Sequence, residues 1–484
     1  MGLQRFDDGR HQPPGGIAAP VERVVVVGAG IAGLTVANAL AHAGIECIVL
    51  EARERAGGRL HTIDLGGSPV DMGGSWIHHP VGNPLRALAA DAGVSCLEGD
   101  PLPRLGAYDL REARRLSRAE VEDVLALRDG AFSAALERLR RELGPTASAA
   151  QAIETFVDGS GLSGGPARRA RQGLRAEIEA DAADAAERQT LRWLWNEIEY
   201  GGDLFGDLPV GGYRSLVRAV AAGLDVRLGV EVTEIAVDRR GVRVRSGGGA
   251  VEEASHLVVT VPLGVLKAGL PRFTPPLPPA RAAAIARLGF GRYEKVALQF
   301  DHPFWRRRGL SHLVLFPADP RQPALWVFDL DAFGEGPTLV CHVFHSASAR
   351  VLDAGPEEAA RWVGGLLTEA LGGAIPQPAA VAVTSWASDP YSRGAYTHVT
   401  PEASPADLDL LGEPLDGRLL FAGEHTQSAR TGYADGAFSS GVREAARLTG
   451  RTVVEVGPLV AEASGEQDRA RRTLRTADPT GDGA

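Results

Sequence analysis

The sequence predicts an α/β protein with more than one hydrophobic core. The clearest evidence is a βαβ pattern near the start: RVVVVGAG is typical of a buried strand entering a glycine turn, IAGLTVANALAHAG of a helix, and ECIVLEA of a second strand. A second observation is that helical stretches and stretches of short strands alternate along the rest of the chain. The third is length, because 484 residues exceed what one core usually accommodates. We therefore expect two domains.

The later elements follow from periodicity and turn residues. Residues 111–200 carry Ala, Arg, Glu and Leu at helical spacing, which predicts several amphipathic helices. LPVGGYRSLVRAVAAGL predicts a turn and a helix, and the next 38 residues predict short strands joined by glycine turns. EKVALQF and TLVCHVF are typical of strands, AGPEEAARWVGGLLTEAL of a capped helix, GRLLFAGEHT of a strand meeting a loop, and GAFSSGVREAARLTG of a helix. Residues 1–20 predict a disordered arm and residues 457–484 a flexible tail.

Composition narrows the class of partner. The formal net charge of −10 argues against nucleic acid and mildly favours a cationic substrate, although plain solubility is the better explanation of it. Three widely spaced cysteines without a CxxC pair indicate neither a disulfide framework nor a metal site. The start shows no signal peptide, and no uncharged apolar run approaches the roughly 20 residues of a membrane span. We expect a cytoplasmic protein without a membrane partner.

A dinucleotide site is predicted where the first strand meets the first helix. Gly28 allows the tight turn, Gly30 lets the backbone approach a pyrophosphate, and Gly33 lets helix and strand pack closely. Glu51 ends the second strand, about where a carboxylate would bind ribose hydroxyls. A further glycine pair followed by Arg59 can bring amides and a guanidinium to the same pyrophosphate, and DMGGSW invites a flat ligand.

Five motifs in order, GAGIAGL, EARERAGGR, DMGGSWIH, FAGEHT and GYADGAFSSG, resemble those of the flavin-containing amine oxidase family, which includes monoamine and polyamine oxidases and histone demethylases. The resemblance covers about Val24 to Arg447. It implies a Rossmann-like FAD-binding domain built from residues 21–100, 205–270 and 381–456, and an α+β substrate-binding domain with a mixed sheet, 101–204 and 271–380. It also implies non-covalent FAD, because the position of the flavin-linking cysteine of animal monoamine oxidases is Ala395 here. The residues it assigns to FAD are Gly28, Gly30, Gly33, Glu51, Arg53, Gly58, Arg59, Gly74, Ser75, Trp76, Val232, Gly423, Glu424 and Ala434.

The resemblance also implies a reacting centre. Tyr396 and Tyr433 match an aromatic pair in front of the flavin, and Trp386 matches a tryptophan beside the ring. Lys295 matches a lysine that bonds flavin N5 through a water, and only two of the 51 basic residues are lysines, so a retained lysine is notable. His78 matches a channel residue of polyamine oxidases, with a structural role as the alternative. The less favoured alternatives are ordinary core aromatics for the two tyrosines and Trp386, and a surface base on a strand for Lys295.

The expected reaction passes a hydride from the amine α-carbon to flavin N5, after which the imine is hydrolysed to an aldehyde and O2 is reduced to H2O2. A polyamine is favoured over a monoamine, with Glu197, Glu199 and Asp203 as candidates for distal ammonium groups or, alternatively, a solvated acidic edge. The alternatives are an amino-acid or imine-forming oxidase or desaturase, and an FAD-binding protein without activity. The GG pair lacks the nearby arginine that amino-acid oxidases use, and no coiled-coil insertion supports the demethylase branch. Oligomeric state is not indicated.

Overall fold

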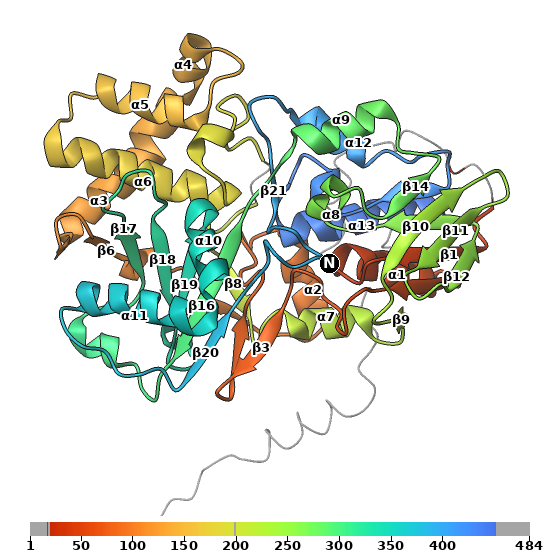
Figure 1. Ribbon diagram of the computed structural model, residues 1–484, viewed down its shortest axis with the longest axis horizontal. Coiled ribbons are helices and arrows are strands. Elements are labelled where there is room, and N and C mark those ends of the chain that lie inside the picture. The colour runs from red at the N-terminus through yellow and green to blue at the C-terminus, as the bar shows by residue number, and fades with distance from the viewer. Residues whose placement is uncertain (1–16, 18–19, 198–199, 452–484) are drawn as a thin grey trace, which may run out of the picture.

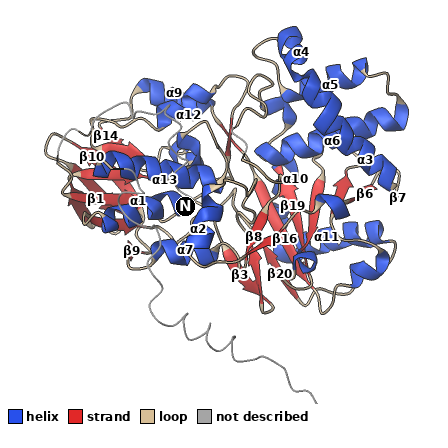
Figure 2. Ribbon diagram, turned by 180° about the vertical axis from the view of Figure 1, so that it is seen from behind, coloured by secondary structure: helices blue, strands red, loops and turns tan. Residues whose placement is uncertain are grey.

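The computed structural model describes residue 17 and residues 20–197 and 200–451. The predicted tail at 457–484, most of the predicted arm at 1–20, and Glu199 lie outside the described residues. Figures 1 and 2 show two halves side by side. In the colours of Figure 1, one is built on the red N-terminal strands and the blue C-terminal helix, and the other on the teal strands and the yellow and orange helices.

The first half is built on a five-stranded parallel sheet in the order β22-β13-β1-β2-β9. Its helices bury small and branched residues against one face, including Leu34 and Leu40. A four-stranded sheet, β12-β11-β10-β14, packs its apolar residues against the other face. The strands are β1 Arg23–Val27, β2 Glu46–Leu50, β9 Asp225–Arg227, β13 His256–Val259, β22 Leu419–Phe421, β10 Val232–Val237, β11 Val242–Ser246, β12 Val251–Ala254 and β14 Arg272–Thr274; the helices are α1 Ile31–His42, α2 Pro84–Asp91, α7 Arg214–Ala221 and α13 Ala434–Thr449.

The second half is built on a seven-stranded mixed sheet in the order β20-β16-β19-β18-β17-β6-β7. Alternate residues of its central strands point to opposite faces. One face packs on two helices, and the other packs in part on α3 and α6 and in part faces the first half. The strands are β6 Gly106–Asp109, β7 Arg114–Arg115, β16 Tyr293–Gln299, β17 Leu313–Phe316, β18 Leu325–Asp329, β19 Thr338–Phe344 and β20 Ala380–Val383; the helices are α10 His345–Ala354 and α11 Pro356–Leu371.

A helical layer covers one end of the second half (Figure 1). Its helices pack around a core that includes Phe132, Leu139 and Ile153, as the amphipathic spacing predicts. Ser117 and Ser148 begin two of them with capping boxes. The layer comprises α3 Arg118–Ala126, α4 Ser133–Leu143, α5 Ala149–Gly159 and α6 Gly164–Ala182, with a π-helical segment at Leu127–Phe132.

The predicted fold class, α/β with a parallel sheet and a second mixed sheet, is confirmed. Two short strands lie across the predicted domain limits: β14 pairs with β10 of the first half, and β20 pairs with β16 of the second. The remaining elements are β3 Thr62–Leu65, β4 Ser68–Asp71, β5 Cys96–Glu98, β8 Asp207–Pro209, β15 Gly289–Phe290, β21 Thr397–His398, α8 Leu263–Lys267, α9 Pro279–Arg287 and α12 Pro405–Leu411.

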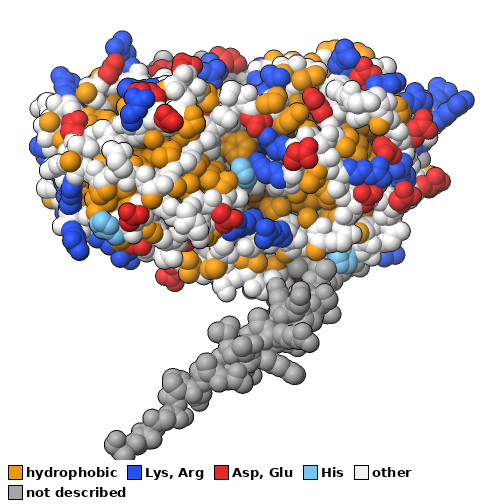
Figure 3. All heavy atoms as spheres, turned by 60° about the horizontal axis from the view of Figure 1, so that its bottom comes forward, with side chains coloured by type: hydrophobic (Ala, Val, Ile, Leu, Met, Phe, Trp, Pro, Cys, Tyr) orange, Lys and Arg blue, Asp and Glu red, His pale blue; other side chains and the backbone are white. Residues whose placement is uncertain are grey.

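The surface carries both signs of charge. On the face in Figure 3, acidic and basic side chains lie among hydrophobic ones without forming a continuous patch of one sign. Among the described helices, none has the length and apolar character that crossing a membrane requires.

Candidate active site

Residues from both halves line a cavity of about 370 Å³. The first half contributes the glycine turn after β1, the end of β2 and the start of α13; the second contributes α6 and one face of the mixed sheet. Every residue that the sequence assigns to FAD or to the reacting centre, except Gly33, lines this cavity. The lining set is Gly28, Gly30, Glu51, Arg53, Gly58, Arg59, Gly74, Ser75, Trp76, His78, Val232, Lys295, Trp386, Tyr396, Gly423, Glu424, Tyr433 and Ala434.

The glycine turn leaves room for a ligand at one position only. Gly28 has φ +107°, and a Cβ there would lie 2.5 Å from the Thr260 hydroxyl. At Gly33 a Cβ would lie 2.1 Å from the Gly28 carbonyl oxygen, so this glycine serves helix packing. At Gly30, by contrast, a Cβ would meet no protein atom within 4 Å. Gly30 is also the N-cap of α1, and no side chain caps that helix, which leaves its positive end available to an anion.

Glu51 is held at the end of β2 by two backbone amides. Its two carboxylate oxygens accept hydrogen bonds from the N–H groups of Ala29 at 2.8 Å and Arg53 at 2.9 Å. The side chain of Arg53 turns away to Asp389, at 2.5 Å. Glu51 is 6% exposed and lines the cavity, so its remaining lone pairs can accept hydroxyl donors.

Arg59 and Glu424, which the sequence assigns separately, form one ion pair at 2.8 Å. The Arg59 guanidinium also donates to the Ala395 carbonyl oxygen. Burial alone would raise the pKa of Glu424, but the Arg59 charge and the hydrogen bond from Thr397 hold it below its ordinary value. Open space at Gly30, an uncapped helix end, a buried carboxylate at the strand end and this pair together fit a dinucleotide cofactor.

Lys295 is buried on β16 and donates three hydrogen bonds. Its Nζ reaches the carbonyl oxygens of Asp71 and Gly73 at 2.8 and 2.7 Å, and the Ser75 hydroxyl at 2.7 Å. Burial lowers the pKa of Lys295 to about 8, while the Asp71 carboxylate opposes the shift. The ammonium therefore ties the GGSW segment to the mixed sheet, and a water would reach it only by sharing or replacing one of these partners. Lys267, in contrast, is exposed.

Three aromatic side chains and one histidine stand around the cavity. The Tyr396 hydroxyl donates to the Ala180 carbonyl oxygen on α6. Trp386 donates from Nε1 to the Met72 carbonyl oxygen at 2.9 Å. The ring centroids of Tyr433 and His78 lie 5.4 Å apart.

His78 enters the cavity as a neutral imidazole. Burial lowers its pKa to about 4, and its Nδ1 donates to the Leu204 carbonyl oxygen at 2.8 Å. With Nδ1 protonated, Nε2 is left as an acceptor. Behind Tyr433 lies Arg430, whose guanidinium carbon is 3.9 Å from the ring centroid and whose side chain pairs with Asp435 at 2.7 Å.

Among the described residues, the acids expected to bind distal ammonium groups do not line the cavity, whereas two other acids of the second half do. Asp203 is exposed outside it and accepts the Gly206 amide, and Glu197 does not line it. Asp181 and Glu177, one turn apart on α6, do. The spacing of four residues between these two acids places them on one face of a helix, and this can be seen in the sequence. The sequence does not show that this face borders the cavity.

Asp181 is the acid without a charged partner. Its Oδ2 accepts a hydrogen bond from Trp195 Nε1 at 3.0 Å, and no further bond to it is seen among residues 20–197 and 200–451. Desolvation first, and then Glu177, raise its pKa well above the ordinary value. Glu177 is compensated, because Arg128 donates to it at 2.9 Å.

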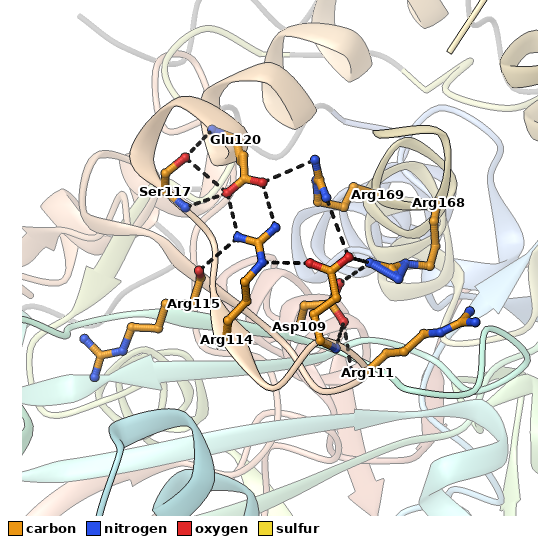
Figure 4. A network of polar contacts seen from close by, with 9 residues as sticks. Asp109, Arg111, Arg114, Arg115, Ser117, Glu120, Arg168 and Arg169 are labelled. Carbon is orange, nitrogen blue, oxygen red and sulfur yellow. Dashed lines mark hydrogen bonds and ion pairs between the residues drawn. The ribbon is translucent and has the colours of Figure 1, made fainter. Parts of the chain in front are cut away.

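Arginine pairs fix α6, which carries both acids (Figure 4). Near its start, Arg168 pairs with the fully buried Asp109 at 2.7 Å, and Arg169 pairs with Glu120 at 3.2 Å. Glu120 also pairs with Arg114 of β7 at 2.8 Å. The helix is thereby tied to the β6–β7 hairpin and to α3.

The mixed sheet adds two polar residues that the sequence did not single out. His342 on β19 and Tyr293 on β16 line the cavity and hydrogen-bond to each other. The sequence could have drawn attention to His342, because it is a polar residue within the otherwise apolar strand TLVCHVF. Among the described residues, no group of His, Cys, Asp and Glu is arranged to hold a metal ion.

Comparison with known proteins gives consistent matches over nearly the whole described chain. A family model described as flavin containing amine oxidoreductase matches residues 31–449. Polyamine oxidase 4 of Oryza sativa subsp. japonica is 32% identical over 464 residues, covering 90% of this chain and 90% of that protein. Probable polyamine oxidase 4 of Arabidopsis thaliana is 33% identical over 438 residues, covering 87% and 85%.

Histone demethylase homologues are also similar. Lysine-specific histone demethylase 1 homolog 3 of Oryza sativa subsp. japonica is 34% identical over 463 residues, covering 90% of this chain but 56% of that protein. The chain thus spans about half the length of these relatives. A solved structure of a putrescine oxidase redesigned in cofactor binding shares the fold, with a TM-score of 0.71, 22% identity and coverage of 90% of this chain and 100% of that one.

Proposed function

The chain belongs to the flavin-containing amine oxidoreductase family, and from that premise we propose that it is an oxidase of polyamines, diamines included. Its cofactor is FAD. When bound, FAD would supply the redox chemistry, namely acceptance of a hydride from the amine α-carbon and transfer of the electrons to O2 to give H2O2, with the released imine hydrolysed to an aldehyde.

The glycine turn, Glu51 and the Arg59–Glu424 pair would hold the FAD. Gly30 and the start of α1 suit the pyrophosphate, and Glu51 suits the ribose hydroxyls. Ala395 offers no thiol for a covalent bond. The aromatic side chains of Tyr396 and Tyr433 would bind and orient an uncharged amine. His78 Nε2 would accept a proton or an N–H hydrogen bond from that amine.

The observation that carries the preference for a polyamine is Asp181. It lines the same cavity as the tyrosines and has no cationic partner among the described residues, so a second ammonium on the substrate would complete the pair. A monoamine has no group to place there. The polyamine oxidases among the similar proteins support this choice.

A panel of putrescine, spermidine, benzylamine and L-tryptophan under air, with peroxide as the readout, tests the proposal. We expect the di- and polyamine to be oxidised with the highest kcat/KM. Preference for L-tryptophan would favour an amino-acid oxidase instead, and absence of peroxide and of flavin bleaching with all four would refute an amine oxidase.

Asp181→Asn tests the residue. The substitution keeps the shape and removes the charge, so KM for putrescine should rise roughly tenfold or more, while kcat/KM for benzylamine changes little. Asp203→Asn is the matched control, because Asp203 lies outside the cavity and an amide oxygen can still accept the Gly206 N–H bond. Equal effects of Asp181→Asn on both amines would show that this carboxylate does not hold the second ammonium.

A further inference from the structure

His342 lies among aromatic side chains in the wall of the cavity. In the mixed sheet, Lys295, His342 and Trp326 lie directly side by side on β16, β19 and β18, on the face turned to the cavity. The neighbours of the histidine are otherwise aromatic: its ring centroid lies 4.5 Å from that of Phe328 and 5.9 Å from that of Trp76. An apolar side chain would pack there without a polar atom to satisfy, so the imidazole requires an explanation.

The imidazole has one hydrogen bond and one polar atom left over. His342 is only 4% exposed, and its Nδ1 bonds to the Tyr293 hydroxyl. Within residues 20–197 and 200–451, that bond to Nδ1 is the one hydrogen bond of the ring, so Nε2 has no protein partner, and the residue lines the cavity. Burial and the nearby Lys295 charge lower the pKa of His342, so the ring is neutral.

The partner of Nδ1 decides where the proton sits. A neutral imidazole has one donor and one acceptor, and a phenolic O–H is the better donor of the pair. In the described part of the chain, the Tyr293 hydroxyl bonds to no other group. Tyr293 therefore donates to Nδ1, and the histidine presents an N–H donor at Nε2 to the cavity.

We propose that His342 is a specificity-determining residue that donates a hydrogen bond from Nε2 to a carbonyl oxygen on the non-reacting part of the substrate, with Tyr293 as its positioning residue. The inference rests on the proposed function, because it assumes that an amine occupies this cavity. It adds to the ammonium position at Asp181 a second position, on the sheet, for an amide-bearing substituent.

The surroundings select a carbonyl rather than an ammonium. A cation would meet the positive charge of Lys295 and an N–H group that cannot accept from it. A hydroxyl would bring a further donor to a place where the nearest polar groups, Lys295 and the Nε2–H of His342, are themselves donors. The reacting nitrogen is also excluded, since a bond to its lone pair would withdraw the electrons that form the C=N bond. A planar amide fits the aromatic rings of Trp326 and Phe328.

Equilibrium binding to the FAD-loaded protein tests the proposal independently of turnover. One probe is a tert-alkyl amine carrying a terminal acetamide, and the other is the same amine with an alkyl group in place of the acetamide. In both probes the carbon next to the amine nitrogen carries no hydrogen, so the amine cannot be oxidised. In His342→Leu, calorimetry should show the acetamide probe binding roughly five- to tenfold more weakly, with the alkyl probe within about twofold of wild type.

Two variants separate this role from a structural one. His342→Gln keeps an N–H donor and should restore most of the affinity for the acetamide probe, and Tyr293→Phe, which frees the tautomer, should lower it. His312→Leu is the matched control, because His312 is a buried histidine of the same half that does not line the cavity. The proposal is overturned if His342→Leu weakens both probes alike or neither. If no amine of the panel above is oxidised, the proposed oxidase function is refuted. The relative binding of the two probes still tests the role of His342 separately.

Discussion

Replacing Lys295 by methionine removes the one buried ammonium that joins the two halves at the cavity. Three charge-assisted hydrogen bonds are lost, each worth at least about 1.5 kcal/mol. Against this, the burial that lowers the pKa of Lys295 from 10.5 to about 8 costs about 3 kcal/mol, which methionine regains. The unfolding free energy should therefore fall by only about 1–2 kcal/mol, and the variant should fold.

The same substitution should also slow catalysis, and this effect is separate from the loss of stability. If the ammonium assists oxygen, reoxidation of the flavin should slow at least about tenfold, roughly 1.4 kcal/mol of barrier, while anaerobic reduction by the amine stays nearly normal. Lys295→Arg should remain impaired, because a planar guanidinium cannot place three donors on Asp71, Gly73 and Ser75 without overpacking a site that is 2% exposed.

Stopped-flow traces of both half-reactions and urea unfolding of the same preparations decide the matter. Ser75→Ala is the sharpest control, because it removes one acceptor and leaves the ammonium in place. If Lys295 acts on oxygen through the Ser75 hydroxyl, this variant should share the slow reoxidation, although it also loses about 1.5 kcal/mol of stability with one charge-assisted hydrogen bond. Wild-type rates in both Lys295 variants would remove the ammonium from the mechanism, and equal slowing of both half-reactions would reduce it to an anchor of the GGSW segment.

Four further outcomes are expected. Acid precipitation should release all FAD into the supernatant, since position 395 is alanine; yellow pellets would disprove non-covalent binding. Glu51→Ala should weaken FAD retention by about 1.5–3 kcal/mol, measured by equilibrium dialysis, and unchanged affinity would place Glu51 away from the ribose. Reoxidation should slow as pH rises through about 8, where Lys295 loses its proton, and a profile flat between pH 7 and pH 9, about one unit to either side, would argue against the ammonium. Because folding lowers this pKa, the cost of the buried charge to stability should also fade as pH rises from about 8 towards 10.5, visible as a rising urea midpoint that Lys295→Met lacks.

Local signals in the sequence predicted the cofactor side of the cavity well. The glycine turn and the end of β2 are contiguous in the chain, and each glycine has one geometric reason to be there, as the space around Gly28, Gly30 and Gly33 shows. The strands at 293–299 and 338–344 and the capped helix at 356–371 follow from periodicity alone. What the pattern could not provide was the pairing of side chains distant in sequence, such as Arg59 with Glu424, which lie 365 residues apart.

The substrate side shows the same limit more strongly. The acids at 197–203 are candidates by their charge and position in the sequence. A helical repeat does not show which face of a helix contacts a neighbouring element. That face is set by tertiary pairs, here Arg168 with Asp109 at the start of α6 and Arg128 with Glu177 further along. Because Asp181 lies four residues beyond Glu177, it shares the face that these pairs turn to the cavity.

The two walls of the cavity therefore favour different groups of a substrate, because one wall carries a carboxylate and the other carries hydrogen-bond donors. On α6, a carboxylate without a cationic partner favours an ammonium. On the mixed sheet, Lys295 and the N–H of His342 favour an uncharged acceptor. A substrate bearing an ammonium at one position and a carbonyl at the other would satisfy both walls, whereas a simple diamine satisfies only the first. Asp181→Asn and His342→Leu should then act independently on the two groups, and a double variant should lose affinity by the product of the two single losses, because the sites are held by separate elements.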